Sequence, residues 1–266
     1  MASFACLGDS ITSDQVTGIG TRVAQLLGAA PCGNFACGYA TCSDWHDGKR
    51  NVTRVTLTEP PNTNTDDNVL SNQVRRLLQA ITLRGEIIRW HHPLAGDFSL
   101  PAEVGLGQGT LFPPDILYIA ISTNDGNHPL NAGICDTEAA LRQPYEALDR
   151  CGIASSLRWA VETLRCACPQ AAIFVATPLH AVSDQTWMSE ENTRRKRDII
   201  LRVCRTLEVQ VIDSFQESGF TPEVAAAHGG VHPDEEWKER IARYVAGAIR
   251  RRMTWAAEPY AEQSAI

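Results

Sequence analysis

The chain has 266 residues, of which 44% are hydrophobic and 21% charged, and its formal net charge is −7. This length and composition are typical of a globular protein with a large core, and an α/β chain of this size is often a single domain. The negative charge argues against a general nucleic-acid-binding surface, and no run approaches the roughly 18 apolar residues of a membrane span. We therefore expect no nucleic-acid partner and no membrane span.

The N-terminus offers no predicted leader, because the first predicted strand begins almost at Met1 and leaves no room for a basic segment and an apolar core. We expect a cytoplasmic protein, or a secreted one whose leader has been removed.

The nine cysteines are an odd number, so at least one thiol is unpaired within a monomer. Cys32, Cys37 and Cys42 follow one another at intervals of five residues, which fits no common zinc site. We expect no bound metal and no cofactor. A disulfide in the 32–42 region stays open, because the sequence does not say which cysteines pair.

The chain opens with an apolar run that ends in Gly8-Asp9-Ser10, and a helical pattern predicted over 13–28 follows. This order indicates a strand, a tight turn and a helix. On such a turn, Ser10 is either an ordinary helix N-cap or a nucleophile beyond the carboxyl end of a strand, where helix N–H groups stabilise negative charge. A second strand is predicted at 34–36, with Gly38 in the loop after it.

Strands and helices alternate along the remaining chain. Helices are predicted at 68–83, 137–151, 155–168, 189–207 and 234–252, and strands at 54–57 (an edge strand), 86–90, 115–121, 171–176 and 209–213. This alternation predicts one parallel sheet covered on both faces by helices. We expect a single domain over 1–252 and a loose tail over 253–266.

Two further polar residues occupy informative positions. Asn124 follows the apolar strand predicted at 115–121, where α/β proteins place ligand contacts, and His232 lies in the loop before the last helix. The basic run 194–197 falls inside a predicted helix, and we interpret it as a solvated face rather than a binding patch.

The four sites Ser10, Gly38, Asn124 and His232 occur in the order of the four sequence blocks of the SGNH, or GDSL-type, hydrolase family, and the chain resembles that family over about 3–252. The resemblance implies a flavodoxin-like α/β/α sandwich with a five-stranded parallel sheet. It further implies that Ser10 is the nucleophile and His232 the base, with an oxyanion hole made by the backbone N–H groups of Ser10 and Gly38 and the side-chain amide of Asn124.

Two positions depart from the family pattern. Ser122 stands where the family usually has glycine, and we expect only a local adjustment there. Gly229 stands where the family usually has the aspartate of the triad. We therefore expect a Ser10–His232 dyad, in which the Gly229 carbonyl, or a nearby loop carbonyl, accepts the Nδ1 proton of His232. Gly229→Asp would then raise turnover if the loop accommodates the side chain.

The alternative is a carboxylate supplied from elsewhere, with Asp234 and Asp213 the nearest candidates in the sequence. His228, in the same loop as His232, is interpreted as a loop histidine rather than a catalytic one.

The polar stretches 58–68 and 91–114 indicate an open, polar site. We therefore expect an ester hydrolase that removes a small acyl group, acetyl on a carbohydrate in the first instance, so that its partner is a small-molecule or carbohydrate ester. Two alternatives stay open: a catalytically weak module that binds acylated sugars, and a hydrolase of the lysophospholipase or thioesterase type. The oligomeric state also stays open.

Overall fold

A five-stranded parallel sheet forms the centre of the protein. The computed structural model describes residues 1–44, 69–82, 90–92, 94–98, 109–126 and 137–257. In the order β2-β1-β5-β6-β7, the strands are Ala30–Asn34, Ser3–Gly8, Ile116–Ala120, Ala172–Ala176 and Gln210–Ile212. All neighbouring strands pair in parallel. This arrangement confirms the predicted single-sheet, flavodoxin-like fold, because the second strand lies at one edge and the later ones follow in sequence order on the other side of the first.

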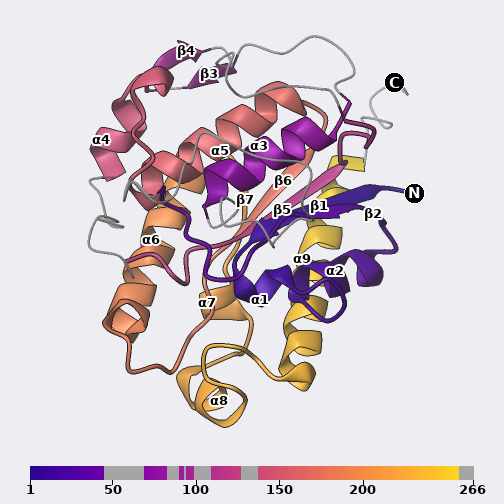
Figure 1. The fold of residues 1–266 in the computed structure, drawn as a ribbon, viewed down its shortest axis with the longest axis vertical. Coiled ribbons are helices and arrows are strands. Elements are labelled where there is room, and N and C mark those ends of the chain that lie inside the picture. Colours follow the sequence, from indigo (N-terminus) through magenta and orange to yellow (C-terminus); the bar gives the residue numbers. More distant parts are fainter. Residues whose placement is uncertain (45–68, 83–89, 93, 99–108, 127–136, 258–266) are drawn as a thin grey trace, which may run out of the picture.

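Helices cover both faces of this sheet (Figure 1). On one face lie α2 (Ile19–Leu27) and α9 (Glu235–Ala257), and on the other lie α3 (Leu70–Ala80), α5 (Ile153–Ala167) and α6 (Glu190–Thr206). Alternate side chains of β1 enter opposite layers: Phe4 packs with α2 and α9, and Leu7 with α3 and α5. The strands are apolar on both sides for this reason, which is why they are recognisable as continuous hydrophobic runs.

Shorter elements complete the described fold. They are α1 (Ser10–Ser13), the hairpin of β3 (Trp90–His92) and β4 (Gly96–Phe98), α4 (Thr137–Arg142), η3 (Tyr145–Ala147), η4 (Thr186–Met188), α7 (Ser214–Glu217) and α8 (Pro222–Ala227).

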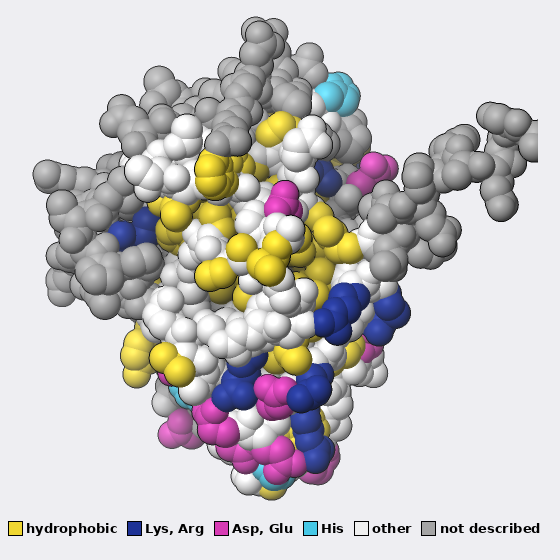
Figure 2. Space-filling model, turned by 90° about the vertical axis from the view of Figure 1, so that its right-hand side faces the viewer, with side chains coloured by type: hydrophobic (Ala, Val, Ile, Leu, Met, Phe, Trp, Pro, Cys, Tyr) yellow, Lys and Arg dark blue, Asp and Glu magenta, His cyan; other side chains and the backbone are white. Residues whose placement is uncertain are grey.

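The edge of the sheet beside β2 carries a shallow apolar surface. Figure 2 shows hydrophobic side chains in the middle of this face and charged side chains of both signs below them. A groove of about 280 Å³ runs between α2 and β2, with Phe4, Ala24 and Pro31 among its lining residues. Arg22 of α2 donates to Glu239 of α9 at 3.1 Å, which ties the two helices of this layer together.

Several predicted boundaries differ from the structure. The helix predicted at 13–28 is interrupted, because the Asp14 side chain accepts from the N–H groups of Val16 (2.8 Å) and Thr17 (2.7 Å) and α2 begins only at Ile19. The second strand ends at Asn34, where we expected it to begin. The last helix continues past the predicted end at 252 to Ala257, so the expected tail is helical in its first part.

The helix predicted at 137–151 is divided. It stops at Arg142, two residues before Pro144, because proline disfavours a helical conformation in the residue before it. The predicted edge strand 54–57 and most of the strand predicted at 86–90 lie outside the described residues.

The described cysteines all carry free thiols, so Cys32, Cys37 and Cys42 are not joined by a disulfide and are instead buried. Among the helices that the structure describes, none is both long and apolar enough to cross a membrane.

Candidate active site

The turn after β1 is held tightly against the neighbouring strand. A Cβ atom on Gly8 would lie 2.4 Å from the backbone oxygen of Ala120, so only glycine fits there. The side-chain amide of Gln73, on α3, forms two hydrogen bonds with the backbone of Gly8. Its oxygen accepts from the Gly8 N–H at 2.8 Å, and its nitrogen donates to the Gly8 carbonyl at 2.9 Å. These contacts fix the direction in which the chain leaves β1 toward Ser10.

Ser10 is the first residue of α1, and Asp9 is the N-cap. The Asp9 side chain accepts from the Ile11 N–H at 3.2 Å and therefore caps the helix in place of the serine. The N-cap reading of Ser10 is thus wrong, and its hydroxyl remains free for another partner.

That partner is His232. Ser10 Oγ lies 2.8 Å from His232 Nε2, although the two residues come from opposite ends of the chain. His232 lies in the loop between α8 and α9, where partial desolvation of the ring and the positive charge of Lys238 lower the pKa of its imidazole below the usual value. The neutral imidazole is the form that accepts a proton from a hydroxyl, so this environment suits a general base.

The expected hydrogen bond from His232 Nδ1 to the Gly229 carbonyl or to a nearby loop carbonyl is not formed among the described residues. The Gly229 carbonyl accepts from the backbone N–H of His232 at 3.3 Å rather than from the ring. In the described part of the chain, no side chain or carbonyl forms a hydrogen bond with Nδ1. Asp234 does not serve, because its carboxylate binds Nδ1 of His228 at 2.8 Å.

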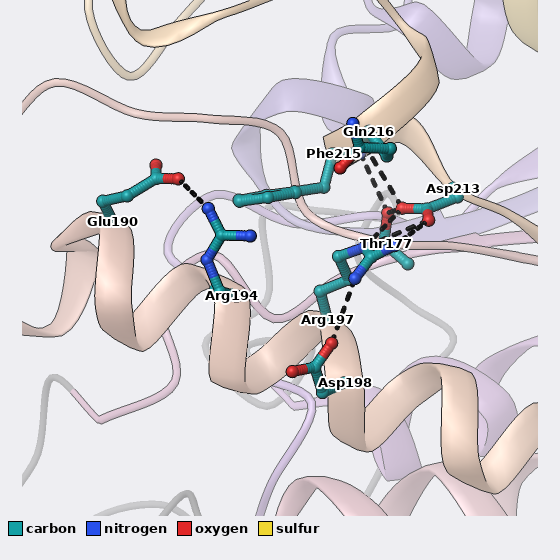
Figure 3. Close-up of polar contacts among 8 residues, drawn as sticks. All are labelled: Thr177, Glu190, Arg194, Arg197, Asp198, Asp213, Phe215 and Gln216. Carbon is teal, nitrogen blue, oxygen red and sulfur yellow. Dashed lines mark hydrogen bonds and ion pairs between the residues drawn. The ribbon is translucent and has the colours of Figure 1, made fainter.

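Asp213, the second candidate for the acid, faces a different cluster (Figure 3). Its carboxylate accepts from Nε (2.9 Å) and Nη2 (2.5 Å) of Arg197 on α6 and from the hydroxyl of Thr177 at 3.1 Å. Neither sequence candidate for a triad carboxylate is therefore placed at His232.

The loop has no room for an acidic side chain in place of Gly229. Its φ is +106°, and a Cβ there would lie 2.1 Å from the backbone oxygen of His232. The condition attached to Gly229→Asp, that the loop accommodates the side chain, is therefore not met, because a Cβ there would collide with the backbone of His232.

The loop after β5 brings Asn124 to the same edge of the sheet. Asn124 is 5% exposed, and its amide donates one hydrogen to the Ala40 carbonyl at 3.1 Å. Ala40 lies two residues after Gly38, so this bond joins the loops that follow β2 and β5. A Cβ on Gly38 would meet nothing within 4 Å, which places open space beside its backbone.

Three donors in this region have no described acceptor. They are the N–H groups of Ser10 and Gly38 and the second amide hydrogen of Asn124. Since each follows a different strand of one parallel sheet at its carboxyl end, they belong to the part of the fold where ligands are bound.

Two buried carboxylates flank the Asn124 loop. Asp9 accepts from the Thr123 N–H at 3.3 Å, and Asp125 accepts from the N–H groups of Cys42 (2.8 Å) and Ser43 (3.0 Å). Burial raises the pKa of Asp9 to about 6 and also raises that of Asp125, against the stabilising effect of these hydrogen bonds.

Lys196 of α6 completes this network, and the sequence analysis missed it. The residue is 1% exposed, and its ammonium donates to the carbonyls of Thr123 (2.9 Å) and Trp187 (2.7 Å). Burial lowers its pKa to about 8, and the charges of Asp125 and Asp9 oppose that shift. The interpretation of 194–197 as a wholly solvated face is therefore wrong at this residue. Helical spacing was the available signal, because Lys196 shares the buried face of Thr193 and Ile200.

No three His, Cys, Asp or Glu side chains of the described residues gather in a way that could hold a metal ion.

Ser122 has an unfavourable backbone conformation. Its φ is +117°, a region that favours glycine, and it is fully buried with a hydroxyl that forms no hydrogen bond. The conformation fits the glycine that the resemblance to the family implies at this position.

Comparison with known sequences supports the assignment suggested by the four blocks. A model of the GDSL-like lipase/acylhydrolase family matches residues 57–240, a span that contains Asn124 and His232 and begins after Ser10 and Gly38. No curated protein matches the chain significantly by sequence.

Solved structures share the fold at low sequence identity. A lipase/acylhydrolase from Enterococcus faecalis matches with a TM-score of 0.53 and 13% identity over 95% of this chain and 97% of its own. A family two carbohydrate esterase from Cellvibrio japonicus matches with a TM-score of 0.52 and 17% identity over 96% of this chain and 62% of its own. One from Clostridium thermocellum, in complex with cellohexaose, matches with a TM-score of 0.51 and 13% identity over 96% and 65%.

Ser122→Gly is expected to stabilise the protein by about 1 kcal/mol. Relief of the positive φ and of the unpaired hydroxyl, each costing about 1–3 kcal/mol, outweighs the lost packing and the roughly 0.5–1 kcal/mol entropic cost of glycine. Ser122→Ala is the matched control, because it removes the hydroxyl but keeps the strain. Urea unfolding of the three proteins measures the difference, and a glycine variant less stable than the wild type would contradict the strain.

Proposed function

Because the chain belongs to the GDSL-like lipase/acylhydrolase family, we propose that it is a serine ester hydrolase with Ser10 as the nucleophile and His232 as the general base. The observation that carries the proposal is the 2.8 Å contact between Ser10 Oγ and His232 Nε2. A serine hydroxyl is a weak nucleophile until a base accepts its proton, and this contact provides that base.

The reaction then has two halves. Ser10 Oγ attacks the ester carbonyl as its proton passes to His232 Nε2, and the carbonyl oxygen becomes an oxyanion. The N–H groups of Ser10 and Gly38 and the amide of Asn124 donate to this oxyanion. His232 returns the proton to the leaving alcohol, which leaves an acyl-serine. In the second half, water attacks the acyl-serine as His232 Nε2 takes its proton, and the tetrahedral intermediate collapses to release the acid. His232 returns that proton to the departing Ser10 Oγ, which regenerates the serine and the neutral imidazole.

We propose that Ser10 and His232 act as a dyad. The Gly229 carbonyl is not the acceptor of the ring proton, because it accepts from the backbone N–H of His232. A histidine without a carboxylate partner has a less stabilised imidazolium, so more of the transition-state charge stabilisation comes from the oxyanion hole.

For the substrate, we propose a small acyl group, in the first instance acetyl, on a carbohydrate. The proposal is supported by two neighbours described as carbohydrate esterases, one of them in complex with cellohexaose. The polar stretch 58–68, which first suggested an open site, lies outside the described residues. A lipase/acylhydrolase among the neighbours favours the second candidate, a hydrolase of longer acyl chains such as a lysophospholipase or thioesterase.

Ser10→Ala is expected to abolish ester hydrolysis and leave the unfolding midpoint close to that of the wild type, because the Ser10 side chain is half-buried and Asp9 makes the helix cap. The measurement is turnover of p-nitrophenyl esters of increasing acyl length, together with an acetylated oligosaccharide. Acetyl esters should be turned over fastest. Equal turnover by the alanine variant would refute the nucleophile, whereas a wild type that binds acetylated sugar without turnover would favour the binding module.

Asn124→Ala is expected to lower kcat by about a hundredfold or more with a smaller change in KM, because its amide acts mainly on the oxyanion. Gln216→Ala, at an exposed position of α7, is the control. A variant that raises KM and leaves kcat unchanged would assign Asn124 to substrate binding instead.

The pH dependence follows from His232. The base must be neutral, so kcat/KM should be lost as pH falls through its pKa, and that pKa should lie below the reference of ~6.5. Lys238→Met removes a positive charge near the ring and should move the acid limb to higher pH. A profile that stays flat down to pH ~4 would be incompatible with His232 as the base.

A further inference from the structure

Lys196 lies behind the proposed oxyanion hole, and we propose that it is a positioning residue whose ammonium holds the Thr123 carbonyl and thereby the Asn124 amide. This inference deepens the proposed function and rests on it. Lys196 touches neither Ser10 nor His232 in the described contacts, so it acts through the loop and not on the substrate.

The Thr123 residue is held at both of its backbone groups. Its N–H donates to Asp9, the neighbour of Ser10, at 3.3 Å, and its carbonyl accepts from Lys196 at 2.9 Å. The carbonyl carbon of Thr123 is bonded directly to the backbone nitrogen of Asn124. Any shift of that peptide plane therefore moves the Asn124 side chain.

The second contact of Lys196 fixes the other side of the loop. Its ammonium donates to the Trp187 carbonyl in η4 at 2.7 Å, and a Cβ on Gly126 would lie 3.2 Å from Trp187 Cβ. Segment η4 therefore packs directly against the residue that follows Asp125. Lys196 joins this segment to the Asn124 loop through one group.

Charge explains why a lysine suits this position. The ammonium is almost fully buried, and its positive charge interacts with the buried carboxylates of Asp125 and Asp9, neither of which it contacts in a direct ion pair. An apolar side chain of similar length would leave two carbonyls without their donor and two buried carboxylates without a nearby cation. Such losses are costly in a buried site and favour movement of the loop.

A displaced Asn124 amide weakens an interaction made mainly in the transition state. We therefore expect Lys196→Met to lower kcat by about tenfold to a hundredfold, less than complete loss of a donor, and to change KM by less than about threefold. The control is Arg195→Met, the exposed neighbour on the same helix, which should keep the kcat of the wild type.

The assays use the full chain and p-nitrophenyl acetate, well below each variant's own unfolding temperature. A folded Lys196→Met protein with the kcat of the wild type would overturn the proposal. Lys196→Arg is the rescue variant, because a cation that reaches either carbonyl should return part of the lost kcat. No recovery in the folded arginine variant would show that the site needs packing rather than a donor, and would also overturn the proposal.

Two further outcomes are decisive. If neither the methionine nor the arginine variant folds, Lys196 serves folding and the positioning role is refuted. Ser10→Ala separates this inference from the proposed function: an active Ser10→Ala protein removes the serine mechanism, whereas an inactive one beside a fully active Lys196→Met protein removes the role of Lys196 alone.

Discussion

Two buried carboxylates, Asp9 and Asp125, flank the loop that carries Asn124, and their charge constrains the surrounding structure. A buried carboxylate must be compensated by hydrogen bonds or an opposite charge. Backbone N–H groups of Thr123, Cys42 and Ser43 provide the first, and Lys196 provides the second. As a result, the loops after β1, β2 and β5 are fixed to one another and to α6, which gives the three proposed oxyanion donors a rigid support.

The His232 loop is built in a different way. The positive φ of Gly229 and the hydrogen bond between His228 and Asp234 shape it. Among the described side chains, His232 forms a hydrogen bond with Ser10, which follows the first strand. A Cβ on Gly229 would meet the His232 backbone, so the loop has adapted to glycine. The lack of a described carboxylate at His232 is therefore a property of the whole loop rather than of one substituted side chain.

Structure could be predicted from the sequence where one physical requirement dominates. The apolar runs of β5 and β6 must be buried on both faces, so their place in the sheet was predictable, and Gly8-Asp9-Ser10 identified the turn because only glycine fits beside Ala120. Structure could not be predicted from the sequence where the contacts of one side chain override a periodic pattern. Asp14 interrupts a helical period by capping Val16 and Thr17, and Lys196 looked solvated because the sequence does not show the two carbonyls and two carboxylates that it meets in the interior.

The two departures from the family pattern differ in their physical consequence. Ser122 adopts the backbone conformation that glycine would adopt, at a cost in strain and an unpaired hydroxyl, because Asp9 and Lys196 hold the next residue, Thr123, on both sides. The backbone geometry expected of glycine is therefore kept at Ser122, and the Asn124 amide is kept as well. Gly229 instead bears on the proposed chemistry, because no described carboxylate forms a hydrogen bond with the ring of His232. Under the proposed mechanism, stabilisation of the transition state falls more heavily on the proposed oxyanion donors, which are the part of the site that the buried charges make rigid.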